Sequence, residues 1–557
     1  MKINSLLPKG INKIIAKKQR NKLRVVIRCH KKLKAQGRLF LIAKLKDTLS
    51  DEKFKRINKK SSKTLFGASS VNPSLVVSQY LYKSLLVTTR FNKAILYSIG
   101  SGNPIRYPLP LEWIEALEKE GYRVDRLSCK IQWISILFVY FCFGIYRALG
   151  LLKSTIIIRI RPANELVSPA AYFNNLTYDN VQLPLDHKDV KNILTWYAQW
   201  NGRNKKIKNL QHNVKNFNET KFDDFSVSYV PITQLNMGSL KALFVFLNWL
   251  IKALLICVKD IMLFRWWTFL LFEQFVQAAI LRYSTQNMVA ADYLLHHNEV
   301  FYRPIWTYEV EKRNARVILY FYSTNNTQSF KNINGYPDVG NILKLSTWPL
   351  VLVWDKYQEQ YVKRLFHSYG VIEIVGQIWF SSNPVINIDM DFKKKIVVGV
   401  FDVHPHRTSW FCSMGGPDDY YDSKVAIQFL KDIKKVLGEY SLVSLHKRKR
   451  NNPYLHKKYK LFLRTFYSEN NISINPDLSA YSLIEKVDLV ISMPFTSTGI
   501  IANYQNKPSI YYDPFGDVQK NDRAAHGIQV IVGIDELDYW VKSIKSQLKM
   551  LENNIKT

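Results

Sequence analysis

Short runs of β-branched and aromatic residues alternate with amphipathic segments along the second half of the chain. The runs predicted to form strands are residues 316–322, 350–354, 371–375, 395–401, 440–445, 487–491 and 509–512. Segments with helical spacing lie between them, at residues 356–369, 422–437 and 455–467. Strands that are apolar along most of their length and alternate with helices are typical of parallel sheets covered on both faces. The pattern therefore predicts an α/β fold from about residue 285 onwards.

Two long apolar stretches lie upstream of this region. Residues 131–146 carry no charge, but they are shorter than the roughly 20 residues of a bilayer-spanning helix. Residues 242–283 are rich in Phe, Leu and Trp, and several charged residues interrupt them. Three interpretations are open: buried core helices, helices lying in the headgroup region of a membrane, or a span at 131–150. Aromatic residues beside basic ones suit the headgroup region; those concerned are Trp249, Trp266 and Trp267.

These patterns divide the chain into four parts. Residues 1–60 form a basic N-terminal segment, and residues 61–380 form a first lobe that includes the apolar segments at 131–150 and 242–283. A second lobe covers residues 381–535, because polar and proline residues separate the strand at 371–375 from the next one. Residues 536–557 are expected to form a C-terminal helix that packs back on the first lobe.

The charge of the chain predicts an anionic partner. The 557 residues carry a formal net charge of +35, and residues 1–60 alone hold 20 Lys and Arg against three acidic residues. Such a surplus suits nucleic acid, an anionic membrane or a phosphorylated substrate. Zinc-finger spacing, an RRM-like aromatic motif, a coiled-coil basic region and sequence repeats are all missing, so nucleic acid is not expected. A basic segment together with apolar helices supplies the two signals of stable anchoring, which predicts a peripheral protein on the cytoplasmic face of the bacterial inner membrane.

The cysteines argue for a reducing compartment and against a zinc site. They are scattered, with neither a Cys-x-x-Cys pair nor the spacing of zinc ligands, so no bound metal is expected. No secretory signal is evident, and reduced thiols of a cytosolic protein are the simplest interpretation. The five residues are Cys29, Cys129, Cys142, Cys257 and Cys412.

Residues that suit an anionic ligand follow three of the predicted strands. Doubly wound sheets bind ligands at the C-terminal ends of their strands. Asp402 begins the loop after the strand at 395–401, and this loop carries two imidazoles and a guanidinium group that can recognise a phosphate or carboxylate: His404, His406 and Arg407. The run after the strand at 440–445 is either a solvated basic patch or a phosphate-binding loop, and it begins with His446, Lys447 and Arg448.

A hydroxyl-rich turn and a short helical segment follow the strand at 487–491. Backbone N–H groups and hydroxyl side chains at a helix N-terminus can hold a phosphate, although the same residue types also serve as simple helix caps. Proline fixes such a turn because it is excluded from the helix interior. The residues concerned are Ser492, Pro494, Phe495, Thr496, Ser497 and Thr498.

This strand, its Ser-Met-Pro-Phe-Thr-Ser-Thr turn, the helix and the Lys-Pro-Ser strand that follows resemble the PFTS-motif polysaccharide-biosynthesis proteins. The resemblance covers roughly residues 300–530, and a more distant one extends to capsule-type Kdo transferases and bacterial sialyltransferases. It implies a GT-B-like fold of two facing Rossmann-like lobes, a CMP-activated acidic sugar as donor, and neither a metal nor another cofactor at the donor.

The resemblance also implies roles for particular residues. His404 would meet the donor phosphate, and Ser497 and Thr498 would hold the phosphate or the sugar carboxylate. The basic loop at 446–448 would neutralise charge, and Asp513, after the last strand, would contact ribose or base.

A base for the acceptor hydroxyl is expected from the first lobe. A carboxylate in an aromatic pocket can have a raised pKa, which suits a base. Glu309 is favoured because Trp306 and Tyr308 are its neighbours in sequence, and the other candidates are Glu311 and Asp355. The alternative is that these acids only pair with nearby Lys and Arg.

The function expected from these features is a glycosyltransferase of bacterial surface polysaccharide, of the capsule, O-antigen or lipooligosaccharide kind. It would transfer an ulosonic acid from CMP to a lipid-linked or growing glycan at the membrane. Two alternatives stay open: a CDP-polyol phosphotransferase of the teichoic-acid type, and a non-catalytic membrane-peripheral scaffold or nucleic-acid-binding protein.

Overall fold

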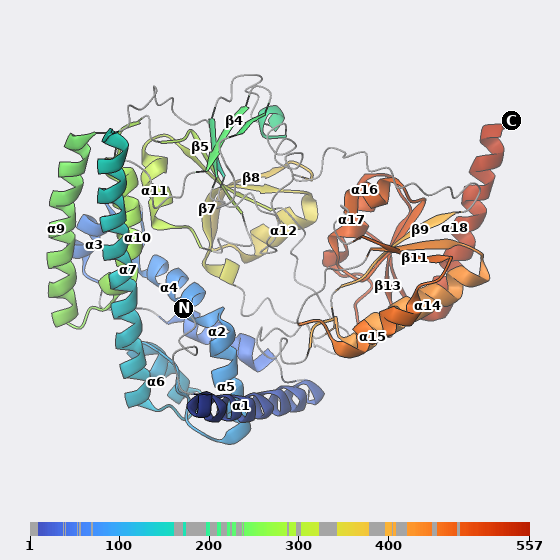
Figure 1. Cartoon of the computed structure of the whole chain (residues 1–557), viewed down its shortest axis with the longest axis horizontal. Helices are drawn as coiled ribbons and strands as arrows, with labels where there is room; N and C mark the ends of the chain where they lie inside the picture. Colours follow the sequence, from blue (N-terminus) through green and yellow to red (C-terminus); the bar gives the residue numbers. More distant parts are fainter. Residues whose placement is uncertain are drawn as a thin grey trace. The chain divides into compact units, whose positions relative to one another are not determined.

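The chain forms two compact units, each built around a mostly or wholly parallel sheet (Figure 1). Unit 1 comprises Met1–Ala43, Ser323–Val339 and Ser382–Thr557, and unit 2 comprises Lys44–Tyr322 and Gly340–Ser381. The computed structural model describes residues 9–36, 38, 40–52, 54, 57–67, 71–160, 171–173, 196–200, 209–212, 220–222, 225–229, 237, 239–286, 289–296, 302–321, 342–377, 396–403, 405–407, 420–447, 454–475 and 480–556.

The sheet of unit 1 is entirely parallel and has the strand order β11-β10-β9-β12-β13-β14. The chain therefore builds outward from β9 in one direction and then crosses back to build outward from β12 in the other. This is the strand order of a doubly wound nucleotide-binding sheet, whose switch point lies between its first and fourth strands. The strands are β9 (Val397–Phe401), β10 (Val443–Lys447), β11 (Asn471–Ile474), β12 (Leu489–Ser492), β13 (Ser509–Asp513) and β14 (Val530–Val532).

Helices complete unit 1. α14 packs against β10 and β13, and α18 packs against α14, β13 and β14, so the C-terminal helix lies on the sheet of its own unit. The sequence predicts that this helix packs back on the first lobe, which corresponds to unit 2. The contacts given above are with elements of unit 1, and packing on unit 2 stays a prediction. The elements are α1 (Lys9–Ala35), α14 (Ser423–Glu439), α15 (Lys457–Phe466), α16 (Ala480–Glu485), α17 (Ser497–Tyr504), the 3-10 turn η6 (Arg523–Ala525) and α18 (Gly533–Lys556).

The sheet of unit 2 has the order β3-β4-β2-β1-β5-β6-β7-β8, and only the pairing of β3 with β4 is antiparallel. Its strands are β1 (Ala171–Phe173), β2 (Asn209–His212), β3 (Thr220–Phe222), β4 (Phe225–Tyr229), β5 (Asp292–His296), β6 (Arg316–Tyr320), β7 (Thr347–Val353) and β8 (Ser368–Ile374). Two parallel sheets with helical connections confirm the expected α/β fold with two Rossmann-like lobes.

Three long helices form a layer at the side of this sheet (Figure 1). They are α7 (Arg126–Ile160), α9 (Leu240–Met262) and α10 (Trp267–Tyr283). α7 and α9 both pack on α10, and α10 also packs on α11 (Ile305–Lys312), the helix that leads into β6. The other helical elements are α2 (Phe40–Asp51), α3 (Lys59–Phe66), α4 (Pro73–Leu81), the π-helical turn η2 (Tyr82–Leu86), α5 (Thr89–Ser101), α6 (Leu111–Lys119), the 3-10 turn η5 (Ile342–Leu345) and α12 (Lys356–Leu365).

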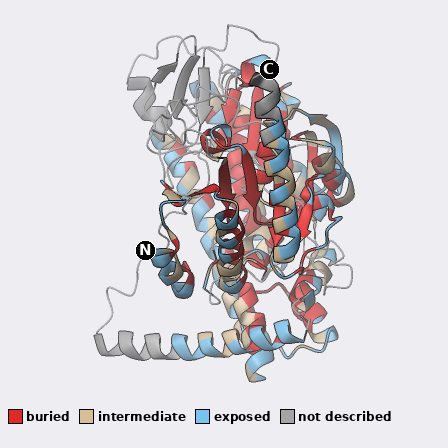
Figure 2. Cartoon of the chain, turned by 90° about the vertical axis from the view of Figure 1, so that its right-hand side faces the viewer, coloured by how far each residue is buried: buried red, intermediate tan, exposed pale blue. Residues whose placement is uncertain are grey.

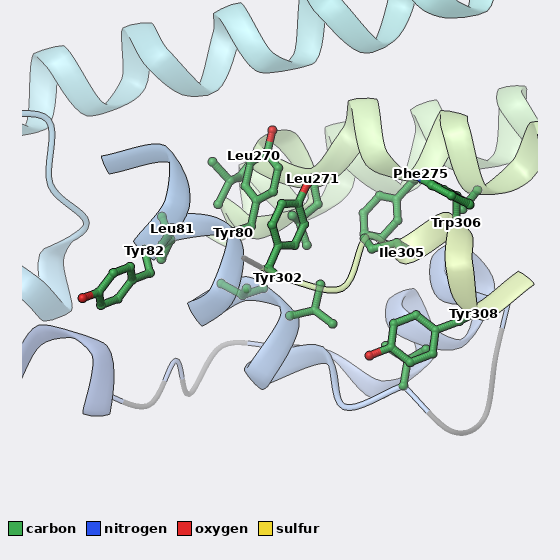
Figure 3. Close-up of a cluster of buried hydrophobic side chains, with 14 of the residues drawn as sticks. Tyr80, Leu81, Tyr82, Leu270, Leu271, Phe275, Tyr302, Ile305, Trp306 and Tyr308 are labelled. Carbon is green, nitrogen blue, oxygen red and sulfur yellow. The ribbon is translucent and has the colours of Figure 1, made fainter. Parts of the chain in front are cut away.

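Aromatic and aliphatic side chains from α4, α10 and α11 converge in the core of unit 2 (Figure 3). The rings of Tyr80 and Tyr302 meet edge to face with centroids 5.8 Å apart, and the Tyr302 hydroxyl donates to Gln274 Oε1 at 3.3 Å. Burial raises the pKa of both tyrosines well above its ordinary value, so both hydroxyls stay protonated. The polar Tyr302 hydroxyl is thus accommodated in this apolar core by its hydrogen bond to Gln274.

The apolar stretch at 242–283 is two helices rather than one. The break lies at residues 263–266, where Phe264 has a φ of 56° and Arg265 pairs with Asp260 at 3.3 Å. Trp249 and Trp267 are buried and Trp266 is half-buried, so these rings pack inward. The apolar interior of unit 2 takes up these three rings, and the interpretation that the helices carrying them lie at a headgroup region stays a prediction.

Burial follows the layers of each unit (Figure 2). Strands such as β9 and β12 are buried along their whole length, whereas helices such as α14 and α18 expose one face. Residues 45–54, which we had assigned to a separate basic segment, belong to unit 2, where Leu45, Leu49 and Phe54 lie in its core. The first 60 residues therefore do not form one independent segment.

Gly144 permits the close approach of α7 and α10. A Cβ at this position would lie 2.4 Å from Cδ1 of Phe272 and 3.0 Å from the backbone nitrogen of Glu273. Gly144→Ala should lower the free energy of unfolding by about 1–3 kcal/mol, the typical cost of overpacking. Gly150→Ala on the same helix is the control, because a Cβ there meets nothing within 4 Å and should stabilise the helix by up to about 1 kcal/mol. Denaturant titrations followed by tryptophan fluorescence measure both, and equal effects would show that α7 and α10 are not in this contact.

Candidate functional site

The candidate site lies at the C-terminal ends of β9 and β12, the switch point of unit 1. The strands are neighbours, and the first residue after β12 stays tied to the end of β9: Met493 N–H donates to Phe401 O at 2.9 Å. Val403 N–H in turn lies 3.3 Å from the Met493 sulfur. Two of the three loops predicted from the sequence are thus brought together here.

The turn between β12 and α17 has a fixed backbone. Phe495 adopts a φ of 62°, a left-handed conformation that is costly for an aromatic residue and needs support from its surroundings. That support comes from two tyrosine hydroxyls: Tyr421 donates to Pro494 O at 2.8 Å and Tyr511 donates to Thr496 O at 2.6 Å. The ring of Phe495 is buried against Tyr511, with centroids 6.0 Å apart.

Three of the four hydroxyl side chains of the turn form hydrogen bonds within it, and the fourth, that of Ser497, does not. Ser492 and Thr498 share a hydrogen bond of 2.8 Å, and Thr496 Oγ1 contacts both Met493 O and Thr498 Oγ1 at 3.0 Å. Ser497 is half-buried, and its hydroxyl has no partner among the described residues. Its side chain is therefore available to a ligand.

The first turn of α17 is also open to a ligand. Thr496 occupies the N-cap position but makes no capping hydrogen bond, because its hydroxyl is engaged within the turn. The amides at the start of α17 are therefore left without a side-chain acceptor, and such amides attract anions. Gly499 keeps the helix close to β13, since a Cβ there would lie 2.8 Å from the Tyr511 ring.

The loop after β9 brings one exposed cation to this edge. Arg407 is exposed, and its Nε donates to Leu455 O at 3.2 Å, which ties the loop to the segment before α15. His406 is half-buried, and burial lowers its pKa, so a neutral imidazole is favoured at neutral pH. His404 lies outside the described residues, and its predicted contact with the donor phosphate stays a prediction.

A buried polar network underlies this loop. Asp402 and His446 are both almost completely buried, with 3.3 Å between Asp402 Oδ1 and His446 Nε2. Tyr459 donates to Asp402 Oδ2, and Tyr467 OH lies 3.0 Å from His446 Nδ1. Burial, reinforced by Asp402, raises the pKa of Tyr459 well above its ordinary value, so this hydroxyl remains a donor. The ring of His446 is buried against Asp402 and Tyr467 and does not face solvent. It therefore supports the start of the loop after β9, whereas the sequence suggested direct charge neutralisation at the donor.

The basic run after β10 is only partly described. Lys447 ends β10 and is half-buried at the same edge of the sheet as Arg407. Arg448 lies outside the described residues, and its predicted phosphate contact is untested.

Asp513 is a structural carboxylate in this fold. It is completely buried and accepts hydrogen bonds from Tyr420 OH at 3.0 Å, Phe515 N–H at 3.1 Å and Val518 N–H at 2.8 Å. Its predicted contact with ribose or base stays a prediction, and the interactions present here shape the loop after β13.

The three acids predicted as bases lie in unit 2 and differ in their surroundings. Glu309 is buried on α11 and pairs with Arg282 at 2.9 Å, and Glu311 pairs with the buried Arg303. Asp355 follows β7 and caps α12, accepting from the amides of Tyr357 at 3.0 Å and Gln358 at 2.9 Å. The sequence leaves two roles open for these acids, a base for the acceptor hydroxyl or simple pairing with Lys and Arg. Both glutamates are paired with arginine in the structure.

Sequence reasoning did not find the tyrosines that shape the site. Tyr420, Tyr421, Tyr459 and Tyr511 are each distant in sequence from the groups that they hold. The one available signal is the Tyr-Tyr pair at 420–421 just before α14, and composition alone does not assign it a partner. Among the described residues, no three His, Cys, Asp or Glu side chains are grouped to hold a metal ion.

Residues 245–541 match the family of polysaccharide biosynthesis PFTS motif proteins, and the chain belongs to this family. The resemblance seen in the turn at 492–498 is thereby confirmed, and the chain is a protein of polysaccharide biosynthesis. No curated protein matches the chain.

Several solved structures share a general likeness with the chain. A UDP-glucosyltransferase from Polygonum tinctorium is 10% identical over 62% of this chain and 80% of its own, with a TM-score of 0.32. A variant of the wall teichoic acid polymerase TagF is 12% identical over 66% and 78%, with a TM-score of 0.32. A UDP-forming trehalose-phosphate synthase from Burkholderia xenovorans is 8% identical over 69% and 92%, with a TM-score of 0.34. Likeness at this level supports no inference about donor or acceptor.

The Arg282–Glu309 pair provides a test of the role of Glu309. Glu309→Gln leaves the guanidinium of Arg282, which is only 14% exposed, without its counter-charge. The free energy of unfolding should fall by about 3 kcal/mol, the cost of breaking a buried pair. Glu359→Gln on α12 is the control, because its partner Lys363 is 50% exposed and the loss of this surface pair should cost about 1 kcal/mol or less. Unchanged stability of Glu309→Gln, together with lost transfer activity, would instead identify Glu309 as the base.

Proposed function

We propose that the chain is a glycosyltransferase that takes its sugar from a nucleotide-activated donor. The observation that carries this proposal is the position of the Ser497 hydroxyl and the uncapped first turn of α17 at the switch point of a doubly wound sheet. Membership of a polysaccharide biosynthesis family supports sugar transfer as the reaction.

The donor phosphate is held by the turn before α17. Ser497 Oγ donates one hydrogen bond, and the amides of the first turn add the positive end of the helix dipole. Arg407 and Lys447, at the same edge of the sheet, add positive charge. The network of Asp402, His446 and Tyr459 keeps the β9 loop in place beside the turn.

The donor is CMP-linked and carries an acidic sugar of the ulosonic type. This assignment rests on the resemblance of the turn to enzymes that use such donors, and on a hydroxyl and amide-rich turn that suits a phosphate or a carboxylate equally. The acceptor is a lipid-linked or growing glycan of a bacterial surface polysaccharide. No metal or other cofactor takes part in the proposed reaction.

The transfer breaks the bond between the anomeric carbon and the phosphate oxygen, and CMP leaves with that electron pair. The acceptor oxygen forms the new bond to the anomeric carbon, and its proton passes to a base. Asp355 is our choice of base, because it follows the C-terminal end of β7 and is half-exposed, whereas arginines engage Glu309 and Glu311. Asp355→Asn keeps an N-cap but cannot take up a proton.

A panel of nucleotides tests the class of donor. The full chain is titrated with CMP, CDP, UDP and GDP, and heats of binding and thermal shifts are measured. Stabilisation by CMP above the others supports the proposal. A preference for CDP would favour a polyol phosphotransferase, a preference for UDP or GDP would contradict the CMP assignment alone, and no response to any nucleotide would contradict transfer from a nucleotide donor.

Ser497→Ala tests the proposed phosphate contact. Loss of one hydrogen bond to a charged group, worth about 1.5–3 kcal/mol, should weaken CMP binding roughly 10- to 100-fold. Ser509→Ala is the matched control, because Ser509 begins β13 at the opposite edge of the sheet and donates only to Gly499 O at 3.3 Å. Isothermal titration measures both, and equal affinities of Ser497→Ala and the wild type would remove Ser497 from the donor site.

A further inference from the structure

We infer that the outer faces of α7 and α9 form a membrane-docking surface that lies in the plane of an anionic phospholipid bilayer. We call these two faces together the α7/α9 face. This inference does not depend on the transfer reaction, since it concerns a part of unit 2 that contains none of the proposed donor-binding residues.

Each helix of this face exposes a long apolar stripe. On α7 the stripe includes Ile131, Ile134, Phe138, Cys142, Tyr146 and Leu149, and all of them recur at helical spacing on the exposed side. On α9 and the turn after it, the stripe includes Phe244, Ile251, Leu255, Val258, Met262 and Phe264.

The α7/α9 face is the main apolar surface of the described residues. Of the 29 large hydrophobic side chains that are exposed there, 17 lie on α7, on α9 or on the two residues that follow α9. Both helices are long and apolar enough to cross a membrane, yet only 22% of the apolar window of α7 and 33% of that of α9 are buried. Core helices of a soluble unit would bury most of such a window, so the face is built for contact with an apolar medium.

The exposed charges on these two helices are all positive. α7 has no acidic residue, and the single acid of α9, Asp260, is buried and paired with Arg265. Exposed lysines stand beside the stripes and at their ends, where long side chains can reach lipid phosphates; they are Lys130, Lys153, Lys241, Lys252 and Lys259. A second copy of the chain fits this surface poorly, because a two-fold contact would set lysines against lysines.

The packing of α10 decides how the face meets the bilayer. α10 lies against both α7 and α9, and its own far side packs on α11, which continues into the sheet of unit 2. A spanning arrangement would draw α11 and the Arg282–Glu309 pair into the hydrocarbon, which is costly for charged groups. Lys252, near the middle of α9, also opposes a span. An in-plane arrangement leaves the sheet in water and lets Lys252 reach the headgroups.

Vesicle binding tests the chemistry of the face. The full chain is sedimented with vesicles of phosphatidylcholine alone or mixed with phosphatidylglycerol. Phe138→Glu and Leu255→Glu should each lower the bound fraction several-fold, whereas Tyr539→Glu, at a tyrosine of unit 1 that is 76% exposed, should not change it. Lys252→Glu should lower binding to the mixed vesicles alone, with the exposed Lys542→Glu of α18 as control.

Folding and self-association are measured for the same variants. Each should keep the thermal unfolding midpoint of the wild type, since each changes an exposed side chain. Vesicle binding that is unaffected by all three substitutions on the face would overturn the proposal. A wild-type oligomer that Phe138→Glu dissociates, without any vesicle binding, would assign the face to a second copy and overturn it as well.

An environment-sensitive fluorophore tests the in-plane arrangement. Cys142 is exposed, whereas Cys29, Cys129 and Cys257 are buried, so it can be labelled once Cys412 has been replaced by Ser. A single label at Cys142, or at Ile131→Cys or Leu149→Cys in a chain whose Cys142 is replaced by Ser, should shift to the blue by similar amounts when vesicles are added, because an in-plane helix holds the three positions at one depth. A shift at Cys142 with little change at the other two would indicate a spanning helix and contradict the in-plane arrangement.

Discussion

The hydrogen bond from Met493 N–H to Phe401 O joins the ends of β9 and β12, and the candidate site depends on this junction. Because the two strands are parallel neighbours, the loop after each must leave from the same edge, so the Asp402–Arg407 loop and the turn before α17 begin side by side. The left-handed Phe495 and the hydroxyls of Tyr421 and Tyr511 then fix the backbone of the turn. The hydroxyls of Ser492, Thr496 and Thr498 bond within the turn, and the hydroxyl of Ser497 does not. A turn that is already rigid loses little conformational entropy when a phosphate binds, which favours binding.

A second constraint is the burial of charge. Asp402 in unit 1, and Arg282 and Glu309 in unit 2, lie where an unpaired charge would be costly; Tyr459 donates to Asp402, and Arg282 pairs with Glu309. These pairs couple elements that are far apart in sequence: Asp402 follows β9, and the rings around it come from β10 and α15. A change at either partner therefore acts on the loop or helix that the pair holds, and only through it on bound ligands.

The strands and helices of the second half of the chain could be predicted because their apolar runs are local signals. The order of the strands in the sheet could not be predicted, because the pairing of β9 with β12 joins segments that are far apart in the sequence. The break at Phe264 carries no glycine or proline, and the direction of Trp249 and Trp267 depends on packing against other segments. The turn at 492–498 was found because its residue types and position after a strand are both local. The role of Glu309 was not settled by the sequence, because its aromatic neighbours in sequence say nothing of Arg282, 27 residues away.

A crystal structure of the chain with bound CMP would test the central claim most directly. The account predicts that the phosphate lies within hydrogen-bond distance of Ser497 Oγ and of the first amides of α17, with Arg407 or Lys447 as the nearest cation. A phosphate bound away from the ends of β9 and β12, for example at the sheet of unit 2, would contradict it.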